Sequence, residues 1–248
     1  MPTTDTRQNS YFFMNTKTNK FGISIFILFC SIFLQTSCSK EDNSLSSEKE
    51  EFEREMTAAL ADAQVYGPPT QALAQEVAER FGGRVTDINY KTRESATRKC
   101  ITDHLWPYDL KDMARTTIVA GWDSTEIKPV IKYLVDTSTD RGLFKRYKHQ
   151  TSDYGYWGDL VNLNFGRLST EIQVKTYGIF YASNHGDVAL SVLGDSIYTI
   201  IHDKTGVEPG LSHYYYEIMR ADTSSSATVE HYKQLAIQYY ERFEHIKD

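Results

Sequence analysis

Six consecutive residues, Glu-Ile-Gln-Val-Lys-Thr at 171–176, combine side-chain types that bind ions and polar ligands. In an extended strand successive side chains point to opposite faces, so Glu171, Gln173 and Lys175 share one face. The two aliphatic residues between them point to the other face, into a core. A carboxylate, an amide and an ammonium group in one row suit a site that holds a metal ion and a polar, anionic ligand. Taken alone, the hexapeptide is explained better by an ordinary amphipathic strand with a solvated polar face.

A basic segment upstream has the spacing of a phosphate-binding helix start. Lys91, Ser95 and Lys99 lie four residues apart, and serine is a favoured N-cap residue. The free N–H groups and the dipole of a helix N-terminus attract phosphate. If a helix begins at Ser95, Lys99 lies one turn along on the same face. The segment therefore suits a triphosphate, and the alternative is a solvated basic turn.

A carboxylate lies at the mouth of the apolar strand predicted for residues 113–119. Asp112 precedes this strand, and Arg115 lies within it. Magnesium is usually bound by one or two protein carboxylates together with substrate phosphates. Asp112 and Glu171, on separate strands, are therefore the candidate Mg²⁺ ligands. The alternative is that Asp112 pairs locally with Arg115 or Lys111.

Cationic residues lead into an aromatic turn in the middle of the chain. The run at 145–149 contains Lys148, and Tyr156 and Trp157 follow within ten residues. Either ring could stack on a nucleobase, a contact that contributes about 1–3 kcal/mol per base in stacking sites. The alternative is a β-turn whose aromatic rings pack on the domain surface.

The composition restricts the class of protein. The chain has 248 residues, 40% of them hydrophobic, which is enough for one sizeable domain with flanking segments. Its formal net charge is −6, whereas a general nucleic-acid binder would usually show a basic surface. DNA is therefore not an expected partner, although a local basic pocket for phosphates is compatible with this charge.

The N-terminus is typical of an export signal. Lysines precede the apolar run at residues 21–34, which is short for a membrane span and suits a signal peptide. Small residues then precede Cys38, as in a bacterial lipoprotein signal that covers residues 1–38 or starts at Met14. Cys38 would be lipidated, so we expect the cell envelope (outer membrane or surface) or secretion. An uncleaved membrane anchor, with the domain in the cytoplasm, is the alternative. Residues 39–48 are Ser/Glu-rich and predict a flexible tether.

The pattern of apolar residues predicts an α+β fold with a mixed sheet of about five strands flanked by helices. Gly67, Pro68 and Pro69 are predicted to separate two N-terminal helices. The predicted strands lie at 85–90, 113–119, 144–149, 159–165 and 169–175. The predicted helices lie at 50–66, 70–81, 95–104, 124–134, 179–201 (with a break at Gly186), 214–221 and 227–245.

In this order and spacing the motifs resemble the synthetase domain of the RelA/SpoT family, over about residues 84–180. That family shows a Lys-x3-Ser-x3-Lys segment, an Asp-to-Arg strand, a Gly-Tyr turn and a Glu-Ile-Gln-[Ile/Val]-[Arg/Lys]-Thr strand. The resemblance implies a nucleotidyltransferase-like fold for residues 49–248, with N- and C-terminal helices around the synthetase core. No His-Asp hydrolase domain fits ahead of residue 84, so the chain resembles a divergent single-domain member.

The resemblance also implies an activity. Such enzymes are ATP-dependent pyrophosphokinases that move pyrophosphate from ATP to the 3′-hydroxyl of a guanosine, or in some relatives an adenosine, nucleotide, as in (p)ppGpp alarmone synthesis. By match, the ATP phosphates would be held by Lys91, Ser95, Lys99 and Arg115. Mg²⁺ would be held by Asp112 and Glu171, and Glu171 would also help to take the proton of the attacking hydroxyl. The acceptor nucleotide would be bound by Tyr156, Gln173, Lys175 and Lys148.

The sequence departs from the family in several places. Asn89 replaces the arginine usually found two residues before the first lysine, and the aromatic turn lacks its usual histidine. Asp112 lies three residues before Arg115 instead of the usual five, and Asp109, six residues before Arg115, is the other candidate for the metal aspartate. A catalytically inactive surface lipoprotein that uses the fold as a binding module is therefore the alternative function.

The expected partners follow from these alternatives. For an exported toxin they are ATP, a nucleotide acceptor, the membrane through the N-terminal lipid or signal, and an immunity protein or target-cell factor. His213 and Arg220, near the run at 214–217, could add to the site, but we expect them to lie on the surface of the last helices.

Overall fold

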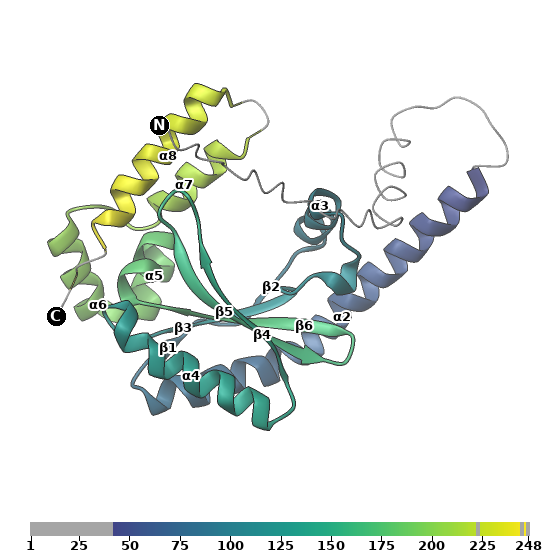
Figure 1. Ribbon diagram of the computed structural model, residues 1–248, viewed down its shortest axis with the longest axis horizontal. Coiled ribbons are helices and arrows are strands. Elements are labelled where there is room, and N and C mark those ends of the chain that lie inside the picture. The colour runs from purple at the N-terminus through teal and green to yellow at the C-terminus, as the bar shows by residue number, and fades with distance from the viewer. Residues whose placement is uncertain (1–41, 222–223, 244–245, 247–248) are drawn as a thin grey trace, which may run out of the picture.

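The computed structural model describes residues 42–221, 224–243 and 246. Its centre is a six-stranded sheet in the order β1-β3-β6-β5-β4, with β2 also paired to β3 (Figure 1). Strands β3 and β6 run parallel, and the other pairs are antiparallel. The strands are β1 (Arg84–Val85), β2 (Asn89–Tyr90), β3 (Ala114–Val119), β4 (Phe144–Thr151), β5 (Trp157–Phe165) and β6 (Leu168–Lys175). The predicted mixed sheet is confirmed, and the strand predicted at 85–90 forms two short strands.

Helices flank this sheet, which confirms the predicted α+β class (Figure 1). They are α2 (Asp42–Arg80), α3 (Arg93–Asp103), the short 3-10 helix η2 (Pro107–Asp109), α4 (Ser124–Asp140), α5 (Tyr177–Ser183), α6 (Gly186–Thr205), α7 (Leu211–Met219) and α8 (Ser226–Glu241). Helix α3 and the pair α7–α8 lie on opposite sides of the view in Figure 1, with the sheet between them. The site described below lies between these helices.

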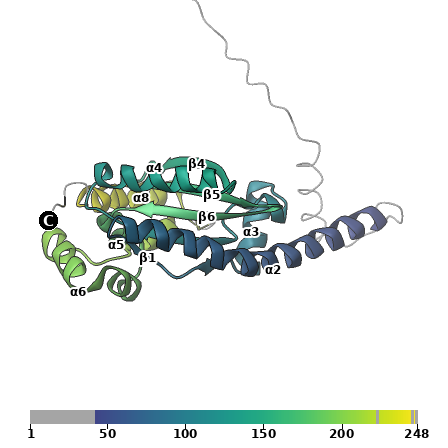
Figure 2. The same ribbon diagram turned by 90° about the horizontal axis from the view of Figure 1, so that it is seen from below.

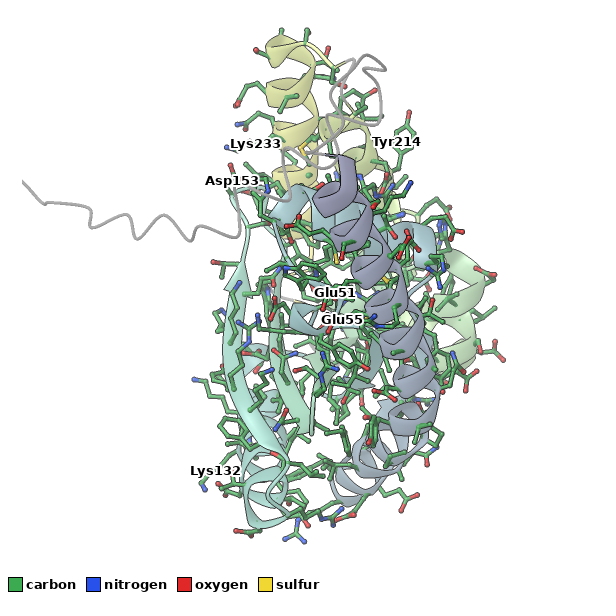
Figure 3. The ribbon with its side chains drawn as sticks, turned by 90° about the vertical axis from the view of Figure 1, so that its right-hand side faces the viewer. Glu51, Glu55, Lys132, Asp153, Tyr214 and Lys233 are labelled. Atoms are coloured by element: carbon green, nitrogen blue, oxygen red, sulfur yellow. The ribbon has the colours of Figure 1, made fainter. Side chains whose placement is uncertain are left out.

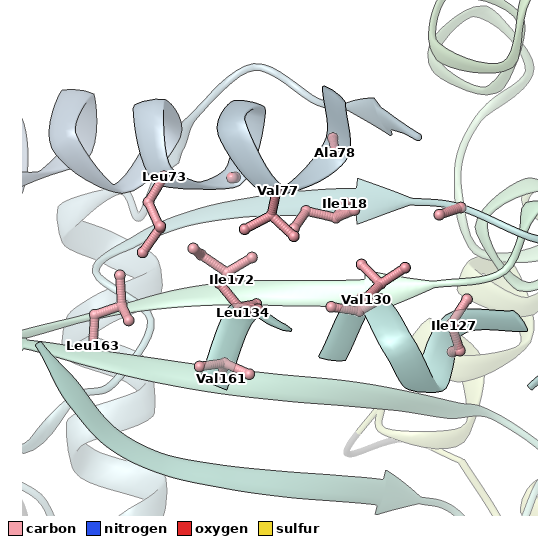
Figure 4. Close-up of a cluster of buried hydrophobic side chains, with 13 residues drawn as sticks. Leu73, Val77, Ala78, Ile118, Ile127, Val130, Leu134, Val161, Leu163 and Ile172 are labelled. Carbon is pink, nitrogen blue, oxygen red and sulfur yellow. The ribbon is translucent and has the colours of Figure 1, made fainter. Parts of the chain in front are cut away.

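The apolar side of the strands packs against α2 and α4. Leu73 and Val77 from α2 meet Ile118 and Ile172 from the central strands (Figure 4). Val130 of α4 belongs to the same cluster, together with other aliphatic residues of β5 and β6. Because side chains alternate along a strand, this packing leaves the opposite row of β6 facing the other side of the sheet.

The predicted break between two N-terminal helices is wrong, because α2 runs through Gly67, Pro68 and Pro69. Proline removes a helical hydrogen bond, a local cost that tertiary packing overrides here. The Thr70 hydroxyl donates to the Tyr66 carbonyl oxygen at 2.8 Å within this turn. Gly67 has a packing role, since a Cβ atom there would lie 2.4 Å from the Tyr90 hydroxyl.

The predicted tether at 39–48 is wrong from Asp42 onward, where α2 begins. Phe52 is 3% exposed, and its ring lies 5.9 Å from that of Trp106. A helix fixed by such contacts extends through glutamate and lysine residues, which have good helix propensity. Figure 2 shows this part of α2 running past the end of the sheet.

The predicted signal, with Met14 and Cys38, lies outside the described residues, and so do residues 39–41 of the tether. Among the helices that the structure describes, none is both long enough and apolar enough to span a membrane.

Candidate active site

The polar row of β6 lies beside matching polar residues of β3. Across the parallel ladder Arg115 pairs with Glu171 and Thr117 pairs with Gln173. Side chains of paired residues project to the same face of a sheet, so these four lie together. Glu171, Gln173 and Lys175 are 6–8% exposed, so the row is buried and not a solvated face. This burial removes the ordinary amphipathic strand as an explanation of the hexapeptide.

Amide groups hold the Glu171 carboxylate from two sides. The Gln173 amide donates to Oε1 at 2.8 Å, and the Asn162 amide donates to Oε2 at 3.3 Å. Asn162 also donates to the Lys111 carbonyl oxygen at 3.2 Å and accepts from Arg146 Nε at 2.7 Å. Because neutral amides restrain the carboxylate without a direct ion pair, its position is fixed while its lone pairs stay available to a cation or a proton.

Asp112 is the buried anion of the basic segment. Its Oδ2 atom accepts from Lys91 Nζ and from Lys99 Nζ, each at 3.0 Å. Burial opposes its ionisation, but the two lysines outweigh burial and lower the pKa of Asp112. The local pairing of Asp112 with Arg115 or Lys111, weighed from the sequence, is replaced by these two ion pairs.

The N-cap of α3 is Thr92, not Ser95 as predicted. The Thr92 hydroxyl accepts from the Ser95 backbone N–H at 3.2 Å, and the helix begins at Arg93. Threonine caps a helix by the same chemistry as serine. Thr92 lies directly before the first helical residue and has an extended backbone, so it takes the N-cap role. Ser95 therefore lies in the first turn of α3, with Lys99 one turn later.

A cavity of about 840 Å³ opens above these residues, and we name it the basic cavity. Arg115 of β3 joins the basic segment here, and α7 forms a further wall. Its lining residues are Lys91, Ser95, Arg98, Lys99, Thr102, Asp103, Arg115, Tyr216, Glu217, Arg220 and Ala221. With five lysine or arginine side chains against two carboxylates, the lining suits a polyanion such as a triphosphate.

A second cavity, of about 740 Å³, lies on the same side of the sheet, and we name it the polar cavity. Three predicted acceptor residues, Tyr156, Gln173 and Lys175, line it together. Arg115 lines this cavity as well as the basic one. The further polar lining side chains are Thr86, Asp87, Asn89, Thr117, Ser183, Asn184, Asp187 and Ser191. The two cavities therefore meet at Arg115, which is the β3 partner of Glu171.

Lys175 is a buried cation in the polar cavity. Its Nζ atom donates to Ser183 Oγ at 3.1 Å and lies 5.3 Å from the centroid of the Tyr156 ring. Burial and the Arg115 charge lower the pKa of Lys175 to about 7, against a smaller opposing effect of Glu171. The charge of this side chain therefore changes near neutral pH.

The aromatic turn separates its two candidate rings. Tyr156 lines the polar cavity, whereas Trp157 packs against both neighbouring hydrophobic clusters. Gly155, with φ of 90°, lies against Tyr240 of α8, and the Tyr156 ring contacts the same residue at 6.1 Å. Tyr156 is thus the ring placed to contact a ligand.

Lys148 is exposed on β4, where its ladder partner is Leu160, and it lines neither cavity. Its assignment to the acceptor stays a prediction.

Helix α7 and its C-cap supply residues that we expected from the sequence to lie on the surface. The prediction that Arg220 lies outside the site is wrong, because Arg220, Glu217 and Tyr216 line the basic cavity. His213 is exposed and lies 3.8 Å from Glu217. No motif links α7 with the basic segment, since more than a hundred residues separate them and the chain reversal that joins them is tertiary.

The residues present fit a magnesium ion. The Asp112 Oδ1 atom is buried and has no hydrogen-bond partner among the described residues. Buried polar atoms normally have a partner, so this oxygen is a natural ligand position. Within the described part of the chain, no three Asp, Glu, His or Cys side chains gather to form a metal site on their own. Two carboxylates completed by substrate phosphates remain compatible with this arrangement.

Comparisons with known proteins agree with this geometry, although no family model matches the chain. The (p)ppApp synthetase toxin Tas1 of Pseudomonas aeruginosa (strain UCBPP-PA14) is 30% identical over 174 residues, which are 68% of this chain and 38% of Tas1. A crystal structure of the complex between the Type VI effector Tas1 and its immunity protein matches with a TM-score of 0.61 and 26% identity, over 77% of this chain and 96% of that chain. The chain contains a RelA/SpoT-like synthetase domain.

The synthetase fold has a further match in the crystal structure of the small alarmone synthetase 1 from Bacillus subtilis bound to its product pppGpp. Its TM-score is 0.51 at 13% identity, over 79% of this chain and 94% of that chain, which supports the fold alone. The predicted family and fold class are confirmed. The chain spans less than two fifths of the length of the curated relative, so the match concerns the synthetase domain.

Proposed function

We propose that the synthetase domain transfers pyrophosphate from ATP to the 3′-hydroxyl of a purine nucleotide. The observation that carries the proposal is the junction of the two cavities at Arg115, between the Asp112–lysine cluster and Glu171. Asp112 and Glu171 line neither cavity themselves, but Asp112 pairs with the basic-cavity residues Lys91 and Lys99. The Glu171 carboxylate accepts from Gln173 of the polar cavity. An adenosine nucleotide is the first acceptor to test, because Tas1 is named a (p)ppApp synthetase.

The basic cavity would bind the donor. Lys91, Lys99 and Arg115 would neutralise the triphosphate, and positioning with charge neutralisation is the main source of rate enhancement in phosphoryl-type transfer. Asp112, through its unpaired Oδ1 atom, and Glu171 would hold Mg²⁺. When bound, the metal would supply a positive charge that neutralises the phosphates.

The polar cavity would bind the acceptor. Tyr156 would stack on the base, and Gln173 and Lys175 would position the sugar and the phosphates. The Glu171 carboxylate would take the proton of the 3′-hydroxyl as its oxygen forms a bond to the β-phosphorus of ATP. The bond between that phosphorus and the α,β-bridging oxygen would break, and AMP would leave.

Product formation tests this proposal. The purified chain is incubated with labelled ATP, Mg²⁺ and each of ADP, ATP, GDP, GTP and tRNA, beside Glu171→Gln. We expect a pyrophosphorylated nucleotide from the wild type and at least a hundredfold less from the variant. Absence of product with every acceptor, or equal product from the variant, would contradict the enzyme and favour a binding module.

We further propose that the domain acts as an exported toxin. The support is that its relative is named a toxin and a Type VI effector and was crystallised with an immunity protein. Expression without residues 1–38 in a bacterial cytoplasm should stop growth, and Glu171→Gln should relieve the arrest. Unimpaired growth with active enzyme present would refute the toxin role.

The location has a separate test. A palmitate analogue should label the wild-type chain and not Cys38→Ala. An unlabelled wild type would exclude lipidation.

A further inference from the structure

Helix α7 closes the basic cavity on the side opposite α3. Tyr216 and Glu217 of α7, with the C-cap residue Arg220, face a cavity whose other walls include the phosphate-binding candidates Lys91 and Lys99. The cavity volume of about 840 Å³ lies within the range of pockets that enclose ligands larger than a triphosphate group alone. The α7 wall is therefore available to a part of a bound nucleotide other than its phosphates.

The α7 wall has the chemistry of a base platform. Tyr216 is the one aromatic side chain among the described residues that line the basic cavity, and it is 37% exposed. The Arg220 guanidinium lies 5.4 Å from the centroid of this ring, and its Nε atom forms an ion pair with Glu217 Oε2 at 3.1 Å. Nucleobases stack on aromatic rings and on guanidinium planes, so the Tyr216–Arg220 pair offers both surfaces.

The platform is fixed to the turn that carries the acceptor ring. The Tyr216 ring lies 6.0 Å from that of Tyr154 in the same turn as Tyr156. Lys233 of α8 pairs with Asp153 at 2.6 Å, and Figure 3 shows these two side chains next to each other where α8 meets the turn. Because α7 and α8 are packed together, the position of Tyr216 is tied to the turn by contacts of both helices.

We propose that Tyr216 stacks on the base of the donor nucleotide and that Arg220 supports it. The inference rests on the proposed function for the assignment of the basic cavity to the donor. The acceptor base has its own candidate ring, Tyr156, in the polar cavity, which Tyr90 also lines, so each cavity has an aromatic side chain beside its charged groups. Helix α7 is then part of the substrate site and not only a cover of the fold.

Direct binding of an ATP analogue tests the assignment without turnover. The full chain is titrated calorimetrically with α,β-methylene-ATP and Mg²⁺, and KM values for ATP and for the acceptor are measured in parallel. Tyr216→Leu should weaken the analogue about tenfold and raise the KM for ATP by the same factor, with the acceptor KM unchanged. Tyr216→Phe, which restores the ring, should recover most of the affinity.

Controls separate a binding role from a structural one. Tyr214→Leu is the matched control, because Tyr214 lies on the same helix, is 56% exposed and lines neither cavity. Arg220→Gln should weaken the analogue by a smaller factor, and it carries the test if Tyr216→Leu does not fold. Wild-type analogue affinity in both cavity variants, equal loss in Tyr214→Leu, or an effect on the acceptor KM alone would overturn the proposal. A wild type that binds the analogue but forms no product would contradict the proposed function and leave the binding role standing.

Discussion

The basic cavity and the polar cavity hold their positive charges in different ways. In the basic cavity Lys91 and Lys99 share the Asp112 carboxylate at 3.0 Å, so a buried anion fixes them before any ligand arrives. In the polar cavity the buried Lys175 ammonium contacts a serine hydroxyl and an aromatic ring, and it has no ion pair among the described residues. In the basic cavity a carboxylate therefore holds the cations, whereas in the polar cavity the charge of Lys175 depends on pH near neutrality.

This difference indicates different roles for the basic and the polar cavity. A cluster of positioned cations suits a donor whose triphosphate charge must be neutralised. A desolvated lysine binds an anion strongly once protonated, because the low-dielectric surroundings strengthen the attraction. Variants that exchange or remove the charged residues of either cavity test this difference.

The largest expected effects come from replacing the two carboxylates. Both replacements should abolish transfer, but they should differ in their effect on the free energy of unfolding. Asp112→Asn should abolish transfer and lower the free energy of unfolding by about 1–3 kcal/mol, because it weakens the ion pairs of two lysines. Glu171→Gln should abolish transfer with little change in stability, since Glu171 makes amide contacts and no ion pair within the described part of the chain. Urea denaturation beside product assays measures both. Equal stability loss in the two variants would contradict the proposed difference between the cavities.

A tenfold effect is expected for the pH dependence of acceptor binding. With a pKa of about 7, Lys175 is charged below neutrality and loses its charge above it. The acceptor KM should therefore rise by roughly tenfold between pH 6.5 and 8.5, whereas the KM for ATP stays nearly flat because Asp112 remains ionised. Lys175→Arg, whose guanidinium stays protonated, should flatten the acceptor profile. A parallel rise in both KM values of the wild type would refute the separate roles.

A smaller effect is expected on the stability of the unliganded chain. Burial lowers the pKa of Lys175, so the folded state binds fewer protons than the unfolded state between about pH 7 and the usual lysine pKa. The destabilisation of the folded state by the buried Lys175 charge therefore becomes smaller as pH rises through that window. Lys175→Met should raise the melting temperature by about 2–4 °C or more at pH 6.5, and the gain should shrink by pH 9. If the increase in melting temperature of Lys175→Met instead grew with pH, Lys175 would not be a desolvated ammonium group.

The smallest effect is expected at Lys148. This exposed residue of β4 lines neither cavity, so Lys148→Ala should change the acceptor KM by less than either Lys175 variant. A larger effect in steady-state kinetics would place the acceptor phosphates beyond the polar cavity, over β4.

Residues close in sequence were predicted well. The alternation of Glu171, Gln173 and Lys175 is observed because strand geometry alone sets it. The four-residue spacing of Ser95 and Lys99 likewise survives the shift of the N-cap to Thr92, since both residues stay on one face of α3. The break at Gly67–Pro69 was wrong because the packing of α2 against the sheet outweighs a local proline penalty.

The sequence by itself determined the family motifs, the alternating strands and the chemical types of the site residues, because these depend on local periodicity and spacing. Only the tertiary structure decided that the polar row is buried, that the two cavities meet at Arg115, and that Tyr216 and Arg220 of α7 belong to the basic cavity. Burial and the meeting of distant segments depend on how the helices pack across the sheet. That packing is a sum over many contacts that no short segment of the chain contains.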